Sequence, residues 1–246
     1  MEAAIRFEGV TKSFGPLRVL DDVSFEVPRG TALCILGRSG TGKSVLLKQL
    51  VGLLKPDSGQ IFVEDEEITA LPAHELARVR KRMGFLFQYS ALFDSISVGE
   101  NVAFPLRRHT RLSGAEVRDR VHDKLARVGL EGIQDKMPSE ISGGMRKRVG
   151  LARALALEPP ILLADEPSSG LDPVTSLEID ELLLDLKHTD GTTMVVVTHN
   201  IPSARRIGDQ LALLDQGRIL ATGSAAELEQ SEHPLVRDFM KSEGAI

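Results

Sequence analysis

The hydrophobic and polar positions along this chain predict a sheet whose strands lie near both ends, with a helical stretch between them. Residues 5–10 and 18–27 alternate between apolar and polar side chains, which predicts antiparallel strands with one buried face. Residues 31–36 form a nearly continuous apolar run, the pattern of a strand that is buried on both faces. A glycine-rich turn, a helical pattern and a strand that carries Ile61 and Val63 then follow.

The middle of the chain has a helical pattern. Residues 73–82 predict a helix and residues 85–87 a short strand, after which residues 89–160 are mostly helical. Breaks in this pattern are expected at Pro105, Gly114 and Pro138. We therefore predict that residues 89–160 form an inserted α-helical subdomain.

Buried strands resume after this insertion, at residues 161–165, 193–198 and 211–214, and a helix is expected over residues 174–187. Strands that alternate with helices predict an α/β fold, with a mostly parallel core sheet and helices on both of its faces. The alternating strands near the N-terminus then form a separate antiparallel β subdomain.

The chain is predicted to be one globular domain over residues 1–246, with a core made of residues 1–88 and 161–246. Its 246 residues are 42% hydrophobic and 26% charged, which is ordinary for a globular protein. The formal net charge of −5 argues against nucleic acid as a partner. Cys34 is the sole cysteine, which excludes an intrachain disulfide, and its apolar neighbours predict a buried core residue.

The sequence shows no segment that targets or spans a membrane. Residues 1–6 lack the basic and apolar regions of a signal peptide. No apolar run approaches the roughly 20 residues that a transmembrane helix needs. We expect a cytoplasmic location, with any membrane attachment provided by a partner.

The glycine-rich turn after residues 31–36 matches the phosphate-loop pattern G-x-x-x-x-G-K-[ST] at each fixed position. Its glycines allow a backbone whose N–H groups converge on phosphate oxygens, at the positive end of the following helix. A lysine then suits the β- and γ-phosphates, and a serine hydroxyl suits Mg²⁺. The glycine spacing does not fit a dinucleotide-binding turn. We expect ATP to be bound by Gly37, Arg38, Ser39, Gly40, Thr41, Gly42, Lys43 and Ser44.

Two carboxylates end the apolar strand at residues 161–165. Ligands of parallel sheets bind at the carboxyl ends of the strands. Because neighbouring strand residues point in opposite directions, Asp165 and Glu166 should differ in role. Asp165 is suited to hold Mg²⁺, and Glu166 to polarise the water that attacks the γ-phosphate.

A second glycine motif precedes the helical stretch that begins at Arg146. It consists of Ser142, Gly143, Gly144 and Met145. A serine followed by glycines is a common helix cap. The same groups could also bind an anion, but the residues alone favour the helix cap.

These motifs, in this order, resemble the ATPase subunits of ABC transporters over essentially the whole chain. The matching elements are the phosphate loop at 37–44, the acidic strand at 161–166, the signature at 141–145, the D-loop at 169–172, Phe14, Gln88 and His199. The resemblance implies a P-loop NTPase fold and hydrolysis of ATP with Mg²⁺. It also implies a head-to-tail dimer, in which the signature of one subunit closes on the ATP held by the other.

The resemblance also implies roles for individual residues. Phe14 stands where the family stacks an aromatic ring on adenine, and it replaces the commoner tyrosine. Met145 replaces the usual signature glutamine, and we expect activity to survive both changes. The catalytic residues implied are Glu166, His199, Gln88 and Lys43. The metal ligands implied are Ser44, Gln88 and Asp165, and the D-loop residue is Asp172.

A narrower resemblance is to the ATPases of Mla/Mce-type phospholipid transporters. It rests on residues 87–95, 100–106, 142–148 and 54–59, above all on Met145 and the segment Ala91–Ser95. The partners implied are a second ATPase subunit, integral permease subunits, periplasmic Mce-type lipid-binding proteins and small accessory subunits. The location implied is the cytoplasmic face of the inner membrane.

The apolar residues after Gln88 have two interpretations. They either pack inside the helical subdomain or form a groove for a short helix of a membrane subunit. The residues concerned are Tyr89, Leu92, Phe93, Ile96, Val98, Val102 and Phe104. Composition favours neither, whereas the resemblance favours the groove.

Three functions remain to be compared. The first is the motor of a transporter, for phospholipid or for the substrate of another bacterial importer. The second is a soluble ABC ATPase, such as one in iron–sulfur assembly. The third is a scaffold that binds ATP without useful hydrolysis, which the presence of Glu166 and His199 disfavours.

Overall fold

A six-stranded sheet forms the centre of the molecule in the computed structural model, which describes residues 2–242. The strand order is β10-β9-β3-β8-β7-β6. The strands are β3 (Ala32–Leu36), β6 (Met83–Leu86), β7 (Ile161–Asp165), β8 (Thr193–Thr198), β9 (Gln210–Asp215) and β10 (Arg218–Gly223). All neighbours are parallel except β9 and β10, so the predicted parallel core is confirmed. The sequence pattern did not indicate β10, because this edge strand is only partly buried.

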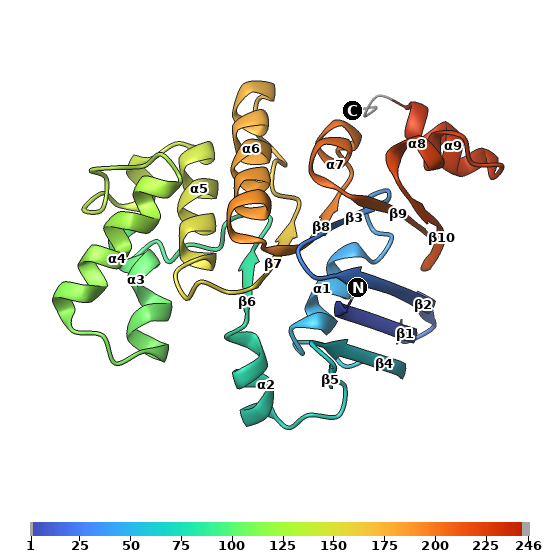
Figure 1. Ribbon diagram of the computed structural model, residues 1–246, viewed down its shortest axis with the longest axis horizontal. Coiled ribbons are helices and arrows are strands. Elements are labelled where there is room, and N and C mark those ends of the chain that lie inside the picture. The colour runs from blue at the N-terminus through green and yellow to red at the C-terminus, as the bar shows by residue number, and fades with distance from the viewer. Residues whose placement is uncertain (1, 243–246) are drawn as a thin grey trace.

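The N-terminal strands form a second, antiparallel sheet with the order β2-β1-β4-β5. They are β1 (Ala3–Phe14), β2 (Leu17–Pro28), β4 (Ser58–Val63) and β5 (Glu66–Glu67). The helix α1 (Lys43–Leu50) shares one apolar cluster with this sheet and with one face of the core sheet. Figure 1 shows α1 beside the strands of both sheets. The helix that follows the phosphate loop is therefore held by both sheets.

The strands β3, β7 and β8 are buried on both faces, as a continuous apolar run requires. On β3, Leu33 and Ile35 face the cluster that contains α1, whereas Cys34 and Leu36 face the other cluster. Cys34 is fully buried, and burial raises the pKa of its thiol, so its predicted place in the core is confirmed. The helices α6 (Pro173–Asp190) and α7 (Ile201–Ile207) contribute to this second cluster.

Three helices between β6 and β7 lie to one side of the sheets, at the left of Figure 1. They are α3 (Val98–His109), α4 (Gly114–Arg127) and α5 (Gly143–Ala154), with a 3-10 turn η1 at Pro138–Glu140. Their buried residues belong to the same apolar cluster as α6 and the core sheet. We keep 89–160 as the proposed bounds of the helical subdomain.

One predicted break is wrong. Pro105 lies inside α3 and does not end it. Val102 and Leu106 are fully buried on either side of the proline, so packing holds both halves of the helix despite the lost hydrogen bond. Gly114 does begin a new helix, which Ser113 caps, and Pro138 begins the turn η1.

The remaining helices are α2 (Ala73–Arg80), α8 (Ala225–Glu229) and α9 (Pro234–Lys241). α8 and α9 follow β10 and lie at the upper right of Figure 1. A contact of the C-terminal tail with another subunit is a hypothesis that falls partly on residues 243–246, outside the described residues. Among the helices of residues 2–242, none combines the length and the hydropathy that a membrane-spanning helix requires.

Candidate functional site

The phosphate loop runs from the end of β3 to the start of α1. Gly40 and Gly42 have φ angles of +84° and +104°, which side chains other than glycine rarely adopt. A Cβ on Gly37 would lie 2.4 Å from the carbonyl oxygen of Leu214, and one on Gly42 would lie 2.9 Å from that of Val19. The glycines are therefore needed for the shape of the loop and for its fit against β9 and β2. Arg38 and Ser39 are exposed on the loop.

The ammonium of Lys43 is held inside the loop. Nζ donates hydrogen bonds to the carbonyl oxygens of Gly37 at 2.7 Å and Arg38 at 3.0 Å, and Thr41 Oγ1 also donates to Arg38 O. Burial lowers the pKa of Lys43, and the nearby carboxylate of Glu166 opposes this shift. A buried cation that has only carbonyl partners on the loop is suited to bind an incoming phosphate.

Ser44 and Asp165 form the candidate metal pair. Ser44 Oγ donates to Asp165 Oδ1 at 3.0 Å, although the two residues are 121 positions apart in the chain. Burial raises the pKa of Asp165, and the bond from Ser44 opposes this. One hydroxyl and one carboxylate fit Mg²⁺ that keeps most of its other ligands from water and substrate phosphates.

Glu166 differs from Asp165 in its backbone conformation and its contacts, for a reason that strand alternation does not give. It lies just beyond β7 in the left-handed region, with φ of +48°. Its N–H donates to Val197 O at 2.8 Å. The turn directs its carboxylate toward β8 and α1, where Thr198 Oγ1 donates to Oε2 at 3.1 Å and Lys43 Nζ lies 3.7 Å from Oε1.

His199 follows β8 and meets the same carboxylate. Its Nδ1 lies 2.9 Å from Glu166 Oε2, and its backbone N–H donates to the same oxygen at 3.3 Å. The imidazole is more than half exposed, whereas the carboxylate is almost fully buried. The exposed ring can therefore contact a ligand while it orients the buried acid.

Gln88 lies just after β6, and β6 pairs with β7, so Gln88 is near the same edge of the sheet. Its main-chain carbonyl accepts a hydrogen bond from Lys147 Nζ. The same ammonium donates to the carbonyl oxygen of Glu166 at 2.9 Å. Lys147 is buried, which lowers its pKa to about 8. No sequence motif singles out Lys147.

Phe14 ends β1 beside the turn into β2, and its ring is nearly half exposed. Lys12 Nζ lies 5.5 Å from the ring centroid. Val19, on the same hairpin, touches the phosphate loop at Gly42. An aromatic face is thus available near the loop, as a stacked base needs.

The signature residues lie on another part of the surface. Ser142 caps α5 by accepting from Met145 N at 3.2 Å, so its predicted capping role is present. Ser142 and Gly143 are exposed. A Cβ on Gly144 would lie 2.5 Å from Thr175 Cγ2, so close packing against α6 requires this glycine. Within residues 2–242, no hydrogen bond joins Ser142–Met145 to Gly37–Ser44.

Asp172 caps the N-terminus of α6, the helix whose Thr175 lies against Gly144 of α5. Its Oδ1 accepts from the backbone N–H groups of Val174 and Thr175, both at 3.0 Å. The hydroxyl of Thr175 also donates to Oδ2, and this bond lowers the pKa of Asp172. The carboxylate therefore fixes the turn that joins the acidic strand to α6.

The segment after Gln88 contains both buried and exposed apolar residues. Val98 and Val102 are fully buried, and Leu92 packs against the core. Phe93 and Phe104 are instead exposed, with ring centroids 5.0 Å apart. The buried side chain of Asn101 fixes the turn before α3 through bonds with the backbone of Phe93, Ile96 and Ser97.

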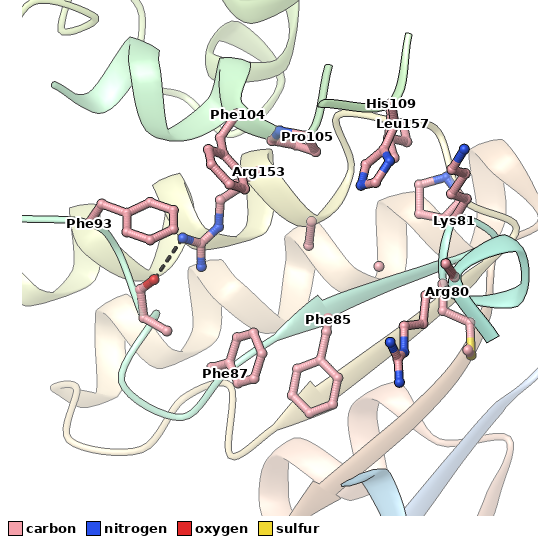
Figure 2. A pocket seen from close by; sticks show the side chains of 16 residues that line it. Arg80, Lys81, Phe85, Phe87, Phe93, Phe104, Pro105, His109, Arg153 and Leu157 are labelled. Carbon is pink, nitrogen blue, oxygen red and sulfur yellow. Dashed lines mark hydrogen bonds between the residues drawn. The ribbon is translucent and has the colours of Figure 1, made fainter. Parts of the chain in front are cut away.

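Phe93 and Phe104 line an open groove with a volume of about 500 Å³, shown in Figure 2. Phe85 and Phe87 form its opposite wall, with ring centroids 4.2 Å apart. The ionisable side chains that line it are all basic: Arg80, Lys81, His109 and Arg153. Tyr89 is 87% exposed but does not line the groove.

The comparisons with known proteins agree with this geometry. The family described as ABC transporter matches residues 20–169. The probable ribonucleotide transport ATP-binding protein mkl of Mycobacterium leprae (strain TN) is 46% identical over 240 residues, or 98% of this chain and 69% of that protein. The intermembrane phospholipid transport system ATP-binding protein MlaF of Escherichia coli (strain K12) is 44% identical over 222 residues, or 90% of this chain and 82% of that protein.

A solved structure is also similar over nearly its whole length. It is the dimeric post-hydrolysis state of an ATP-binding cassette bound to ADP and Pi. The TM-score is 0.84 at 36% sequence identity, and the match covers 89% of this chain and 98% of that chain.

Proposed function

Because the chain belongs to the ABC transporter family and is an ATP-hydrolysing subunit of the ABC type, we propose that it works as a pair beneath a membrane permease. We further propose that the cargo is phospholipid, moved between the inner and outer membranes. One observation supports the motor most directly: Lys43 and His199 both approach the carboxylate of Glu166 at the edge of the core sheet.

We assign ATP hydrolysis to the site around the Glu166 carboxylate. The loop glycines and Lys43 bind the β- and γ-phosphates of ATP, and Phe14 stacks on the adenine. Ser44 and Asp165, with Gln88, would hold Mg²⁺, which would supply positive charge to the phosphates. Glu166 orients and polarises the attacking water, and His199 holds the Glu166 carboxylate and contacts the γ-phosphate.

Pairing of two subunits around two ATP molecules is supported by the exposed signature. Ser142 caps α5 with its own hydroxyl, yet it stays open to solvent together with Gly143. The N-terminus of α5 can therefore receive a phosphate from outside the chain. A similar cassette is dimeric with ADP and Pi bound, which supports the same arrangement here.

The permease is assigned to the groove between Phe85 and Phe104. Four phenylalanines give it apolar walls, and its charged lining is basic. A short amphipathic helix with an acidic residue fits both properties. An exposed apolar groove also favours a transporter motor over a soluble ABC ATPase of iron–sulfur assembly. The permease would keep the chain on the cytoplasmic face of the membrane.

We prefer phospholipid as the cargo because this chain is similar to MlaF, which is named for intermembrane phospholipid transport. The protein mkl, at a similar identity, is named for ribonucleotide transport and supports the second candidate cargo. Under the phospholipid proposal, periplasmic lipid-binding proteins of the Mce type and small accessory subunits complete the complex.

The test is purification of the tagged full-length chain from detergent-solubilised membranes, with identification of bound subunits and extraction of bound lipid. We expect a permease that carries phospholipid. Recovery of the chain free of any membrane subunit would contradict the motor. A permease that transports ribonucleotides, without bound phospholipid, would contradict only the cargo.

A further inference from the structure

Lys147 joins three segments of the candidate site through one side chain. It lies on α5, five residues after Ser142, and is only 4% exposed. Its ammonium donates to the backbone carbonyls of Gln88 and Glu166. In the part of the chain that the structure describes, Lys147 forms no ion pair, so these carbonyls are its partners.

The two carbonyls belong to loops that follow adjacent parallel strands. Gln88 comes after β6 and Glu166 after β7, and these strands pair directly. A charged donor bonded to both loops fixes the distance between them, because charge-assisted hydrogen bonds are the stronger class. The signature helix, which supplies this donor, is thereby attached to the loop that carries the candidate base.

The bond to Glu166 holds a strained turn. A residue other than glycine at φ of +48° needs its surroundings to maintain the conformation. The Glu166 N–H is bonded to Val197 O, and its carboxylate is bonded to Thr198 and His199. Its carbonyl oxygen accepts from the backbone N–H of Ser169 at 3.2 Å, within the same turn, and from Lys147 Nζ at 2.9 Å. Among the described residues, Lys147 is the one side chain that bonds to this carbonyl, so its loss leaves the carbonyl held by the turn itself.

We infer that Lys147 is a positioning residue for ATP hydrolysis: it holds Glu166 in the left-handed turn that aims its carboxylate at His199 and Lys43. This inference rests on the proposed role of Glu166. The same ammonium makes the position of that carboxylate depend on the position of α5. Closure of the signature on a partner's ATP would then align the water-activating group of the same chain.

Other contacts make the attachment of α5 rigid without reaching Glu166. Arg153 donates to Ser90 O at 2.5 Å and to Ala91 O at 2.7 Å. Gly150 fits against the same segment, because a Cβ there would lie 3.2 Å from Ser90 Cβ. These contacts hold the loop after β6, whereas Lys147 also reaches the loop after β7. Removal of the Lys147 ammonium should therefore lower the rate of ATP hydrolysis more than it lowers the stability of the fold.

The test compares Lys147→Met with a matched buried lysine. Lys187 on α6 is 8% exposed and donates to the carbonyl oxygen of Ile207 at 3.0 Å, outside the site. Unlike Lys147, it also pairs with a carboxylate, that of Asp209 at 3.1 Å. For the purified full-length chain, we expect Lys147→Met to lower kcat about tenfold or more, with KM for Mg-ATP changed less than about twofold. Lys187→Met should keep kcat near the parental value, even if its melting temperature falls.

Two further variants separate positioning from general damage. Lys147→Gln keeps an N–H donor and should recover part of kcat. In a Glu166→Gln background, Lys147→Met should cause no further loss, because the group that it positions is already absent. Parental kcat for Lys147→Met, equal effects on kcat and KM, or additive losses in the double variant would each overturn the inference.

The proposed function fails by a different result. If Glu166→Gln alone hydrolyses ATP at the parental rate, the assignment of Glu166 is wrong before Lys147 is considered. If Glu166→Gln is inactive and Lys147→Met is fully active, only the inference about Lys147 is overturned.

Discussion

Nδ1 of His199 lies 2.9 Å from Oε2 of Glu166, although the two residues follow different strands of the core sheet. The ring is half exposed and the carboxylate is buried, so the pair joins an outward-facing group to an inward-facing one. Lys43 approaches the other carboxylate oxygen at 3.7 Å. Both oxygens of the Glu166 carboxylate therefore have a partner with an ionisable side chain.

Glu166→Gln should bind ATP and hydrolyse it about 10²–10⁴ times more slowly, because the amide keeps the size of the side chain and loses the base. ATP should then accumulate in a dimer, which size-exclusion chromatography would detect alongside a phosphate-release assay. Glu181→Gln, an exposed change on α6, is the control. Near-parental turnover with a monomeric elution profile would falsify the assignment.

Lys43→Ala should weaken Mg-ATP binding about 100-fold or more, since a phosphate in the loop loses its buried counter-charge. The fold should survive, because the lysine is a buried cation whose lowered pKa reports a cost of burial. Titration calorimetry measures the affinity. Lys48→Ala, on the exposed face of the same helix, should bind like the parent. Equal affinities for both variants and the parent would remove Lys43 from the site.

Phe93→Asp should leave the isolated subunit folded and able to bind ATP, yet weaken its attachment to the permease. The carboxylate would remove part of one apolar wall and offset the basic lining that is proposed to attract an acidic partner helix. Co-purification from membranes measures the attachment. Tyr89→Asp is the control, since Tyr89 is exposed outside the groove. Leu92→Asp should instead destabilise the chain, because Leu92 packs on the core. Full attachment of Phe93→Asp would contradict the docking site.

Ser142→Arg should block ATPase activity by placing bulk and charge where a partner's γ-phosphate enters, while each chain still binds ATP. Mixed with Lys43→Ala, it should recover some activity. In a head-to-tail heterodimer, one site combines both defects and the other combines two intact halves. Recovery relative to each variant alone is measured by phosphate release. A Ser142→Arg homodimer with parental activity would exclude the signature from catalysis.

Asp180→Asn should affect stability in a pH-dependent way. Asp180 on α6 is 1% exposed, and Oδ2 accepts from Ser203 and Arg206, whereas Oδ1 has no hydrogen-bond partner among the described residues. Burial raises its pKa above 3.8, Ser203 and Arg206 oppose the shift, and Glu181 adds to it. Because the folded-state pKa is raised, the stabilisation from Asp180 is complete below the unfolded value and is lost as pH rises through the folded value.

The neutral variant should therefore gain stability relative to the parent as the pH rises above about 4, by roughly 1 kcal/mol or about 2–4 °C in melting temperature. Thermal unfolding across that range measures the difference. The control Glu181→Gln, at an exposed position, should show a smaller change. A difference between Asp180→Asn and parent that is constant with pH would show that burial of this charge does not govern the effect.

The sequence alone determined the features that depend on neighbours along the chain. The phosphate loop, its preceding strand and its following helix were predicted at 37–44 and lie there, because glycine spacing and hydrophobic period are local properties. The parallel sheet followed from strands that alternate with helices. The left-handed turn of Glu166 has no such local signal, because its bonds come from β8 and α5.

Only the tertiary structure decided which side chains meet. Ser44 and Asp165 are 121 positions apart, and Lys147 reaches Gln88 across 59 positions. The apolar residues after Gln88 had one composition but two environments: Val98 and Val102 turn into the core, and Phe93 and Phe104 line the groove. A sequence pattern specifies that a residue is apolar or charged. The packing of α3 and α5 against the core sheet decides whether such a residue is buried in the core or exposed on the surface.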